Sequence, residues 1–239
     1  MDMSFSPLPP IATRVDACAD ALRTAILGGR FPAGQRLPAE RVLASQFGVT
    51  RVTLRGALAR LAARGLVSAH QGRGTVVCDY QASGGPDLIG ALIAAAPVKG
   101  PIYRDLLAVR RALAGVVLER LAASTSDLDP IHRAIDDFAD AVESSDMEAM
   151  ASADLAVLRA LLDATDSAVL RLCLNPILRV LQGAPDLRAA IYRNPSENLA
   201  GWRALAAWLQ SPEEGSVAML QSLLAARDRE TLAAFEPSR

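Results

Sequence analysis

The stretch Arg36 to Arg73 reads RLPAERVLASQFGVTRVTLRGALARLAARGLVSAHQGR, and the rest of the chain is organised around it. Between about residues 51 and 64, apolar residues recur at intervals of three and four, including Leu54, Leu58 and Leu61. This spacing predicts a helix with one buried stripe. Arginines on such a helix that fall outside the stripe are expected to point outward.

A shorter helix is predicted just upstream, over about residues 38 to 47. Proline is tolerated in a first turn, Glu40 is favoured there by the helix dipole, and Gly48 is suited to end the helix. Thr50 can then cap the following helix through its hydroxyl group. Two short helices joined by a tight turn that contains glycine form a helix-turn-helix, whose second helix enters the DNA major groove.

The hydrophobic period changes after Gly65. Residues 66–70 and 75–78 are β-prone runs, separated by the short polar segment 71–74, which contains a cation. This arrangement predicts a β-hairpin, which beside a helix-turn-helix forms a wing.

Taken together, Leu22 to Cys78 resembles the winged-helix domain of the GntR family of bacterial transcription regulators. Three pieces in the family's order carry the resemblance: ILGGRFPAGQRLPAE, LASQFGVTRVTLRGALARLAARGLV and QGRGTVV. The resemblance implies base and phosphate contacts by Arg41, Arg51 and Arg55, phosphate contacts by Thr50 and Thr53, and a wing tip of Gln71, Gly72 and Arg73 that enters the minor groove. The sequence departs from the family at Gly56, where glutamate is usual, and at Val52, where threonine or another polar residue is common.

The charge distribution supports a nucleic-acid partner. The whole chain has a net charge of −1, which by itself argues against one. Residues 1–78, however, hold ten arginines and no lysine against four acidic residues, whereas residues 79–239 carry a net charge of −7. Seven arginines between Arg36 and Arg73 accompany a single acidic residue, Glu40. A basic head on an acidic body is the electrostatic footprint of a protein that binds phosphate at one end.

Composition bounds the fold class. The chain has 239 residues, is 51% hydrophobic and only 4% aromatic, and is rich in alanine, leucine and arginine, which favours helices. We therefore expect a mainly α protein: an N-terminal winged helix-turn-helix of three helices and a small β-hairpin wing, joined to an all-α bundle. A cytoplasmic location is expected, since no long uncharged apolar run and no signal-like N-terminus are present. The three cysteines are not in metal-binding spacing and are expected to be buried free thiols.

The expected domain organisation has four parts. Residues 1–10 are expected to be disordered, 11–78 to form the winged helix, 79–86 to be a linker, and 87–235 to be an all-helical domain for effector binding and dimerisation. Helices are predicted in that domain at 87–96, 101–123, 127–144, 146–164, 167–182, 195–210 and 212–234. Asn175-Pro176 is expected to kink or split the fifth of these.

The helical part resembles the ligand-sensing domain of the FadR subfamily. The segments IYRDLLAVRRALAGVVLERLAA, DLAVLRALLDATDSAVLRLCLNPILRVL and YRNPSENLAGW carry this resemblance. Most such domains hold a metal ion with one Asp and three His, but this chain has only two histidines, so that site cannot form. No metal or cofactor is therefore expected. The resemblance places four residues at effector-binding positions, namely Arg110, Asp154, Arg159 and Trp202.

These observations predict a DNA-binding transcriptional regulator, acting as a repressor and homodimer on an inverted-repeat operator. A small metabolite, such as an acyl-coenzyme A or an organic acid, would control its affinity for double-stranded DNA. Two alternatives remain open. One is an architectural DNA binder or protein-docking module that has lost effector binding, and the other is an enzyme built on the helical bundle. No catalytic constellation supports the second, because neither histidine is set in a nucleophile-base motif.

Overall fold

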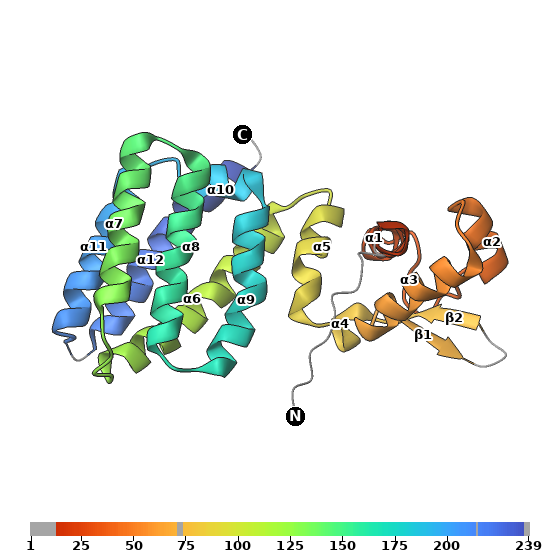
Figure 1. Cartoon of the computed structure of the whole chain (residues 1–239), viewed down its shortest axis with the longest axis horizontal. Helices are drawn as coiled ribbons and strands as arrows, with labels where there is room; N and C mark the ends of the chain where they lie inside the picture. Colours follow the sequence, from red (N-terminus) through yellow and green to blue (C-terminus); the bar gives the residue numbers. More distant parts are fainter. Residues whose placement is uncertain (1–12, 71–73, 214, 237–239) are drawn as a thin grey trace, which may run out of the picture. The chain divides into compact units, whose positions relative to one another are not determined.

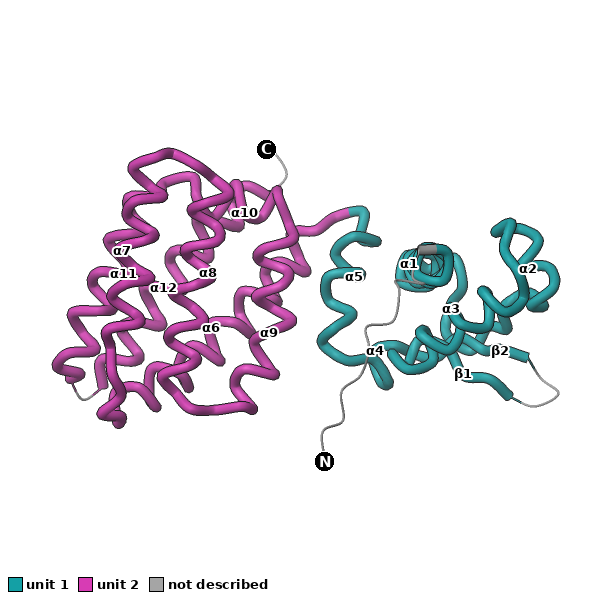
Figure 2. Tube along the Cα trace, viewed as in Figure 1, with its two compact units in different colours: residues 1–97 teal, residues 98–239 magenta. Residues whose placement is uncertain are grey.

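The computed structural model describes residues 13–70, 74–213 and 215–236 of the chain. It divides into two compact units, an N-terminal unit of residues 1–97 and a C-terminal unit of residues 98–239 (Figure 2). Each unit has its own hydrophobic interior. None of the helices within the described ranges has the length and apolar character needed to cross a membrane.

The N-terminal unit is a winged helix-turn-helix followed by short helices (Figure 1). Its elements are α1 (Thr13–Leu27), α2 (Glu40–Gln46), α3 (Arg51–Ala63), β1 (Val67–His70), β2 (Gly74–Val77), α4 (Tyr80–Ser83), the 3-10 helix η1 (Pro86–Leu88) and α5 (Ile89–Ala95). Helix α2 begins at Glu40, so Pro38 precedes the helix instead of lying in its first turn as predicted. Gly48 adopts a φ of +60° in the turn before α3, in agreement with its predicted role as a helix terminator.

The leucine stripe of α3 forms the centre of this unit. Leu54 and Leu61 are fully buried and belong to the same apolar cluster as Leu22 of α1 and Leu66. The strands β1 and β2 are antiparallel, with Val67 opposite Val77. The mainly α class with a small wing is thus confirmed.

The segment expected to be a linker is structured and packs against the wing. Gly65 turns the chain from α3 into β1 with a φ of +70°, and a Cβ atom at this position would clash with the carbonyl oxygen of Ser83. The Ser83 hydroxyl group donates to the carbonyl oxygen of Gly65 at 2.7 Å. The four-residue helix α4 is therefore held against the turn that starts the wing, and Gly65 makes this close approach possible.

The C-terminal unit is helical throughout the residues that the structure describes. Its elements are α6 (Gly100–Ala122), α7 (Asp129–Ser144), α8 (Met147–Ala164), α9 (Ala168–Gly183), α10 (Pro185–Ile191), α11 (Pro195–Gln210), α12 (Ser216–Leu232) and the 3-10 helix η2 (Ala233–Phe235). Helix α10 was not predicted. Helix α9 continues through the buried Pro176 as one element, so of the predicted kink or split the split does not occur, and the kink stays a prediction.

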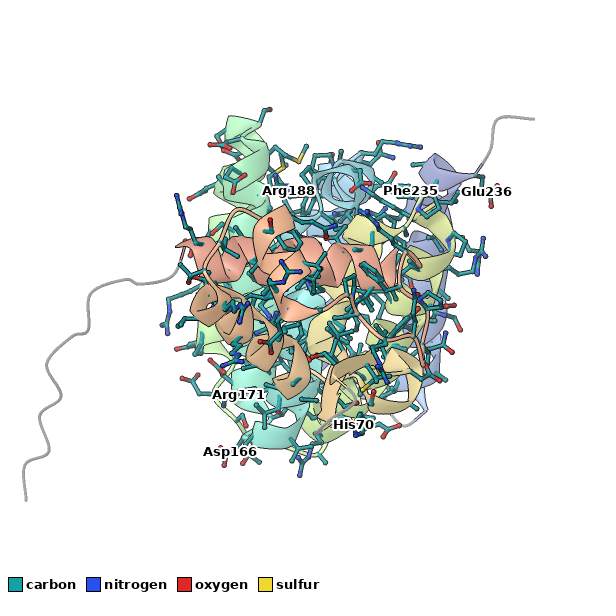
Figure 3. The ribbon with its side chains drawn as sticks, turned by 90° about the vertical axis from the view of Figure 1, so that its right-hand side faces the viewer. His70, Asp166, Arg171, Arg188, Phe235 and Glu236 are labelled. Atoms are coloured by element: carbon teal, nitrogen blue, oxygen red, sulfur yellow. The ribbon has the colours of Figure 1, made fainter. Side chains whose placement is uncertain are left out.

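Polar residues set the ends of α8 and α9. The Asp146 carboxylate accepts the amide of Glu148 at 2.9 Å and so caps α8. Asp166, with a φ of +48°, lies in the turn between α8 and α9, and Arg171 follows in the first turns of α9 (Figure 3). The cysteines differ from prediction: Cys18 is buried, Cys78 is half-buried and Cys173 is exposed, although all three are free.

Candidate DNA-binding surface and effector site

The outer face of α3 carries Arg51, Val52 and Arg55, all of them exposed. The buried residues of this helix are Leu54, Ala57, Leu58 and Leu61, as the apolar spacing predicted. The two arginines are one helical turn apart, so their side chains project from neighbouring positions on the surface. The face opposite the core is thus the cationic one.

Two threonines fix the first turn of α3. The Thr53 amide donates to Thr50 Oγ1 at 3.1 Å, which confirms the predicted N-cap, and the two hydroxyl oxygens lie 2.9 Å apart. No acidic residue occupies this first turn, whereas Arg51 begins the helix. The partial positive charge of the helix N-terminus and the Arg51 guanidinium therefore favour the same ligand, an anion such as a phosphate.

Three of the clustered arginines are neutralised within the N-terminal unit. Arg55 Nε lies 2.8 Å from Glu40 Oε2 of α2. Arg60 pairs with Asp16, and Arg64 Nε lies 3.4 Å from Asp87 Oδ2. The two aspartates lie outside the stretch Arg36 to Arg73, so the excess of arginine over acid in that stretch overstates the free positive charge.

Arg36, Arg41 and Arg51 form no ion pair with any described residue. Arg41 and Arg51 were predicted to contact DNA, whereas Arg36 was not. Arg36 forms an isolated bridge with Val76, which places this exposed arginine at the edge of the β-hairpin.

The predicted wing tip, Gln71, Gly72 and Arg73, lies outside the described residues. His70 precedes it at the end of β1 (Figure 3), with Nε2 3.1 Å from Ser68 Oγ. The wing is therefore described as far as the two paired strands, and its predicted minor-groove contact stays a prediction.

In the C-terminal unit, Asp154 of α8 is the centre of a polar cluster. Its Oδ2 accepts the Tyr192 hydroxyl group at 2.8 Å, and its Oδ1 accepts Trp202 Nε1 at 2.6 Å. Burial raises the pKa of the Asp154 carboxyl above its usual value, although these two hydrogen bonds and the charge of Arg110 favour ionisation. Burial and the same carboxylate also raise the pKa of Tyr192, so its hydroxyl group stays a donor.

A second carboxylate, that of the buried Asp228 on α12, joins this helix to α6. Arg110 Nη2 lies 2.6 Å from Asp228 Oδ1, and Arg111 pairs with the other carboxylate oxygen. The Asp228 side chain is 5% exposed, and the Arg110 side chain is 20% exposed. A buried carboxylate shared by two guanidinium groups is fully compensated in charge.

Three of the four predicted effector residues belong to this region. Arg110 is close enough to Asp154 to act on its pKa, and Trp202 is hydrogen-bonded to the same carboxylate. Arg159 is exposed and does not join the cluster. Tyr192 and Asp228 were missed as cluster members, although Tyr192 begins the quoted segment YRNPSENLAGW.

The cluster is not suited to hold a metal. Among the residues that the structure describes, no group of three or more His, Cys, Asp and Glu side chains comes together. Both oxygens of Asp154 already accept hydrogen bonds from uncharged donors. The indole N–H of Trp202 and the phenol group of Tyr192 thus occupy the two Asp154 oxygens that would have to bind a metal ion, and neither group is a usual metal ligand in this protonated form.

Comparison with known proteins agrees with both units. The model of bacterial regulatory proteins of the gntR family matches residues 14–77, and the FCD domain model matches residues 105–231. The chain is 34% identical over 211 residues to the uncharacterized HTH-type transcriptional regulator Rv0494 of Mycobacterium tuberculosis, covering 86% of this chain and 84% of that protein.

Two further comparisons are narrower in what they show. A fatty acid metabolism regulator protein of Haemophilus influenzae is 44% identical over 75 residues, which is 31% of each chain. A solved structure described as Lar, which controls expression of the Listeria monocytogenes agr system, superposes with a TM-score of 0.62 at 18% identity, covering 95% of this chain and 98% of that one. The latter likeness shows the fold alone.

The matched family consists of transcriptional regulators and not of enzymes, which agrees with the absence of a catalytic motif in the sequence. A DNA-binding winged helix and an effector-binding helical domain occur in one chain, the first at residues 14–77 and the second at residues 105–231. The chain belongs to the GntR family of bacterial transcription regulators, with a C-terminal FCD domain of the FadR type.

Proposed function

We propose that this regulator is a homodimeric repressor that binds an inverted-repeat operator and is controlled by an acidic or acyl metabolite. In this proposal the α3 helices of two subunits enter the major groove of two half-sites. The effector binds in the C-terminal unit near Arg110 and changes the affinity for the operator.

The observation that carries the DNA part is the uncompensated charge of two exposed arginines, one on α2 and one at the N-terminus of α3. Arg41 and Arg51 are exposed and have no counter-ion among the described side chains. An arginine without a partner offers its planar guanidinium to a guanine edge or a phosphate. Thr50 and Thr53 lie at the same helix end, where hydroxyl and amide groups position a phosphate.

The dimer follows from the size of the reading surface. A single recognition helix reads too few base pairs for useful specificity, and two-fold symmetric proteins match half-sites spaced by one helical turn. The effector must then bind the DNA-competent and DNA-free arrangements of the dimer with different affinity.

The effector part rests on the partly exposed guanidinium of Arg110. A ligand carboxylate or phosphate can form the same paired hydrogen bonds that the Asp228 carboxylate forms in this structure. Such a ligand would compete with Asp228 and so act on the contact between α6 and α12. An acidic or acyl-coenzyme A effector has the required charge.

One observation favours the second candidate, a DNA binder without a sensing role. The polar cluster satisfies itself, since Asp154 accepts from Tyr192 and Trp202 while Asp228 pairs with two arginines. A polar cluster whose carboxylate oxygens all have hydrogen-bond partners within the protein stabilises the fold without needing a ligand. A ligand screen separates the two functions.

The DNA part is tested with the purified protein and sheared DNA from its own organism, at moderate salt. We expect the retained fragments to share a short inverted repeat near a small number of promoters. Retention without any enriched sequence would leave only charge-driven binding and would contradict site-specific regulation.

The effector part is tested by thermal unfolding with a panel of organic acids and acyl-coenzyme A esters. A ligand that binds the folded state raises the unfolding temperature by mass action. We expect at least one member of the panel to do so and to change retention of the operator fragment, and we expect Arg110→Gln to abolish both effects. If no acid raises the unfolding temperature, the DNA binder without sensing is the better description.

A further inference from the structure

Val52 is the second residue of α3, and its side chain is 81% exposed. No other large hydrophobic side chain in the described ranges is as exposed. It lies outside the buried stripe, and its neighbours in the sequence are Arg51 and Thr53. An apolar side chain at the start of this helix that is exposed to water contributes nothing to the core and is free to contact a ligand of the α3 face.

The surroundings give Val52 a fixed direction. The Thr50 cap holds the first turn of α3, and a β-branched side chain in a helix keeps essentially one rotamer. Ala59 and Ala63 follow on the same outer face, and both are small and exposed. The two methyl groups of Val52 are therefore presented rigidly on a face that a groove can approach closely.

We propose that Val52 determines specificity by contacting the C5-methyl group of a thymine in each operator half-site. This inference rests on the proposed function, in which α3 lies in the major groove. Thymine is the only base that presents a methyl group there, and apolar side chains read it by contact. Val52 forms no hydrogen bonds through its side chain, so at this position it discriminates through the methyl group alone.

The experiment begins with selection of binding sites from a random duplex library by the full-length protein. Each thymine of the enriched site is then replaced singly by uracil, which removes only the methyl group. At one thymine per half-site, we expect uracil to weaken binding of the unaltered protein about three- to fivefold, the effect of one lost methyl contact. Val52→Ala, which removes both γ-methyl groups, should bind the two duplexes almost equally.

Val169→Ala is the matched control, because Val169 is a 69% exposed valine of the C-terminal unit. It should keep the full effect of uracil. If a site is enriched but uracil weakens the unaltered protein and Val52→Ala alike at every thymine, Val52 reads no methyl group and the inference is overturned, while site-specific binding stands. If no site is enriched, the proposed function and this inference fall together. Because Val52 is highly exposed, Val52→Ala is expected to fold normally, so a change in its DNA binding would not result from misfolding. Circular dichroism checks that the variant is folded.

Discussion

The arginines of the two units show opposite uses of the same side chain. In the N-terminal unit, Arg41 and Arg51 are exposed and have no counter-ion among the described residues. In the C-terminal unit, Arg110 and Arg111 share the carboxylate of Asp228, which is 4% exposed as a residue. The first pair of charges is available to any phosphate, whereas the second pair already has a counter-ion that joins α6 to α12 and that an anionic effector would have to displace. The distance of an arginine from an acidic side chain therefore decides whether its guanidinium group is paired or free in the protein without ligand.

The largest expected effect is at the buried acid. Asp228→Ala leaves two partly buried guanidinium groups without their partner, and we expect it to lower the free energy of unfolding by about 3–5 kcal/mol. Urea denaturation measures this. The control is Asp163→Ala, which breaks the pair with Arg171 but removes a carboxylate that is 63% exposed. That variant should cost less than about 1 kcal/mol. Equal losses of unfolding free energy in the two variants would contradict the idea that burial makes the Asp228 pairs more important than an exposed pair.

The next largest effect is expected on DNA binding. Arg51→Ala should weaken specific binding by about 1–3 kcal/mol if Arg51 reads a base, with no change in stability because the side chain is exposed. Arg60→Ala is the comparison, since Arg60 pairs with Asp16 within the fold. Titrations at fixed salt with operator and with random duplex distinguish the cases. An equal loss on both duplexes would make Arg51 a phosphate contact instead.

The half-buried carboxylate of Asp154 gives a pH dependence. Because its pKa is raised in the folded chain, the folded state binds this proton more tightly than the unfolded state does. The free energy of unfolding should therefore fall as pH rises from about 3.9, the usual value of the carboxyl pKa, to the raised value, and this contribution should stay constant above it. Asp154→Asn should remove that slope. Asp140→Asn, at an exposed position of α7, should leave the slope in place. A slope that persists in Asp154→Asn would assign it to another group.

The smallest effect is expected at Gly56. A Cβ atom there would lie 3.3 Å from Val15 Cγ1 of α1, so glycine allows the two helices to pack closely. Gly56→Ala gains about 1 kcal/mol in helix propensity but tightens this contact, and we expect a net change below about 0.5 kcal/mol. The same change in a Val15→Ala background should show more of the gain, as a double-mutant cycle measures. If Gly56→Ala alone raised the free energy of unfolding by about 1 kcal/mol, α1 would have to shift at little cost to accommodate the added methyl group.

Local patterns predicted most of the fold. The leucine spacing of α3, the Thr50 cap and the wing strands all depend on residues a few positions apart, and the structure confirms them. The patterns failed where packing overrides local preference. Pro176 does not split α9, and α4 forms inside the expected linker because Ser83 has a partner at Gly65.

The candidate sites divide in the same way. The exposed cationic face of α3 follows from helical periodicity, since residues outside the buried stripe point outward. The periodicity does not show which of these arginines are paired. Arg60 is neutralised by Asp16, a residue on another helix, whereas Arg51 has no counter-ion among the described residues. The polar cluster likewise needs Tyr192 and Trp202, which lie 38 and 48 positions from Asp154.

The sequence by itself determined the helix-turn-helix, the wing and the helical C-terminal domain, because short-range spacing of apolar, capping and turn residues specifies local structure. Only the tertiary structure decided which charges are compensated. Arg110 and Asp228 are 118 positions apart, and no local pattern shows that they meet. Electrostatic interactions depend on distance in space and on burial, and both are fixed only when the helices pack.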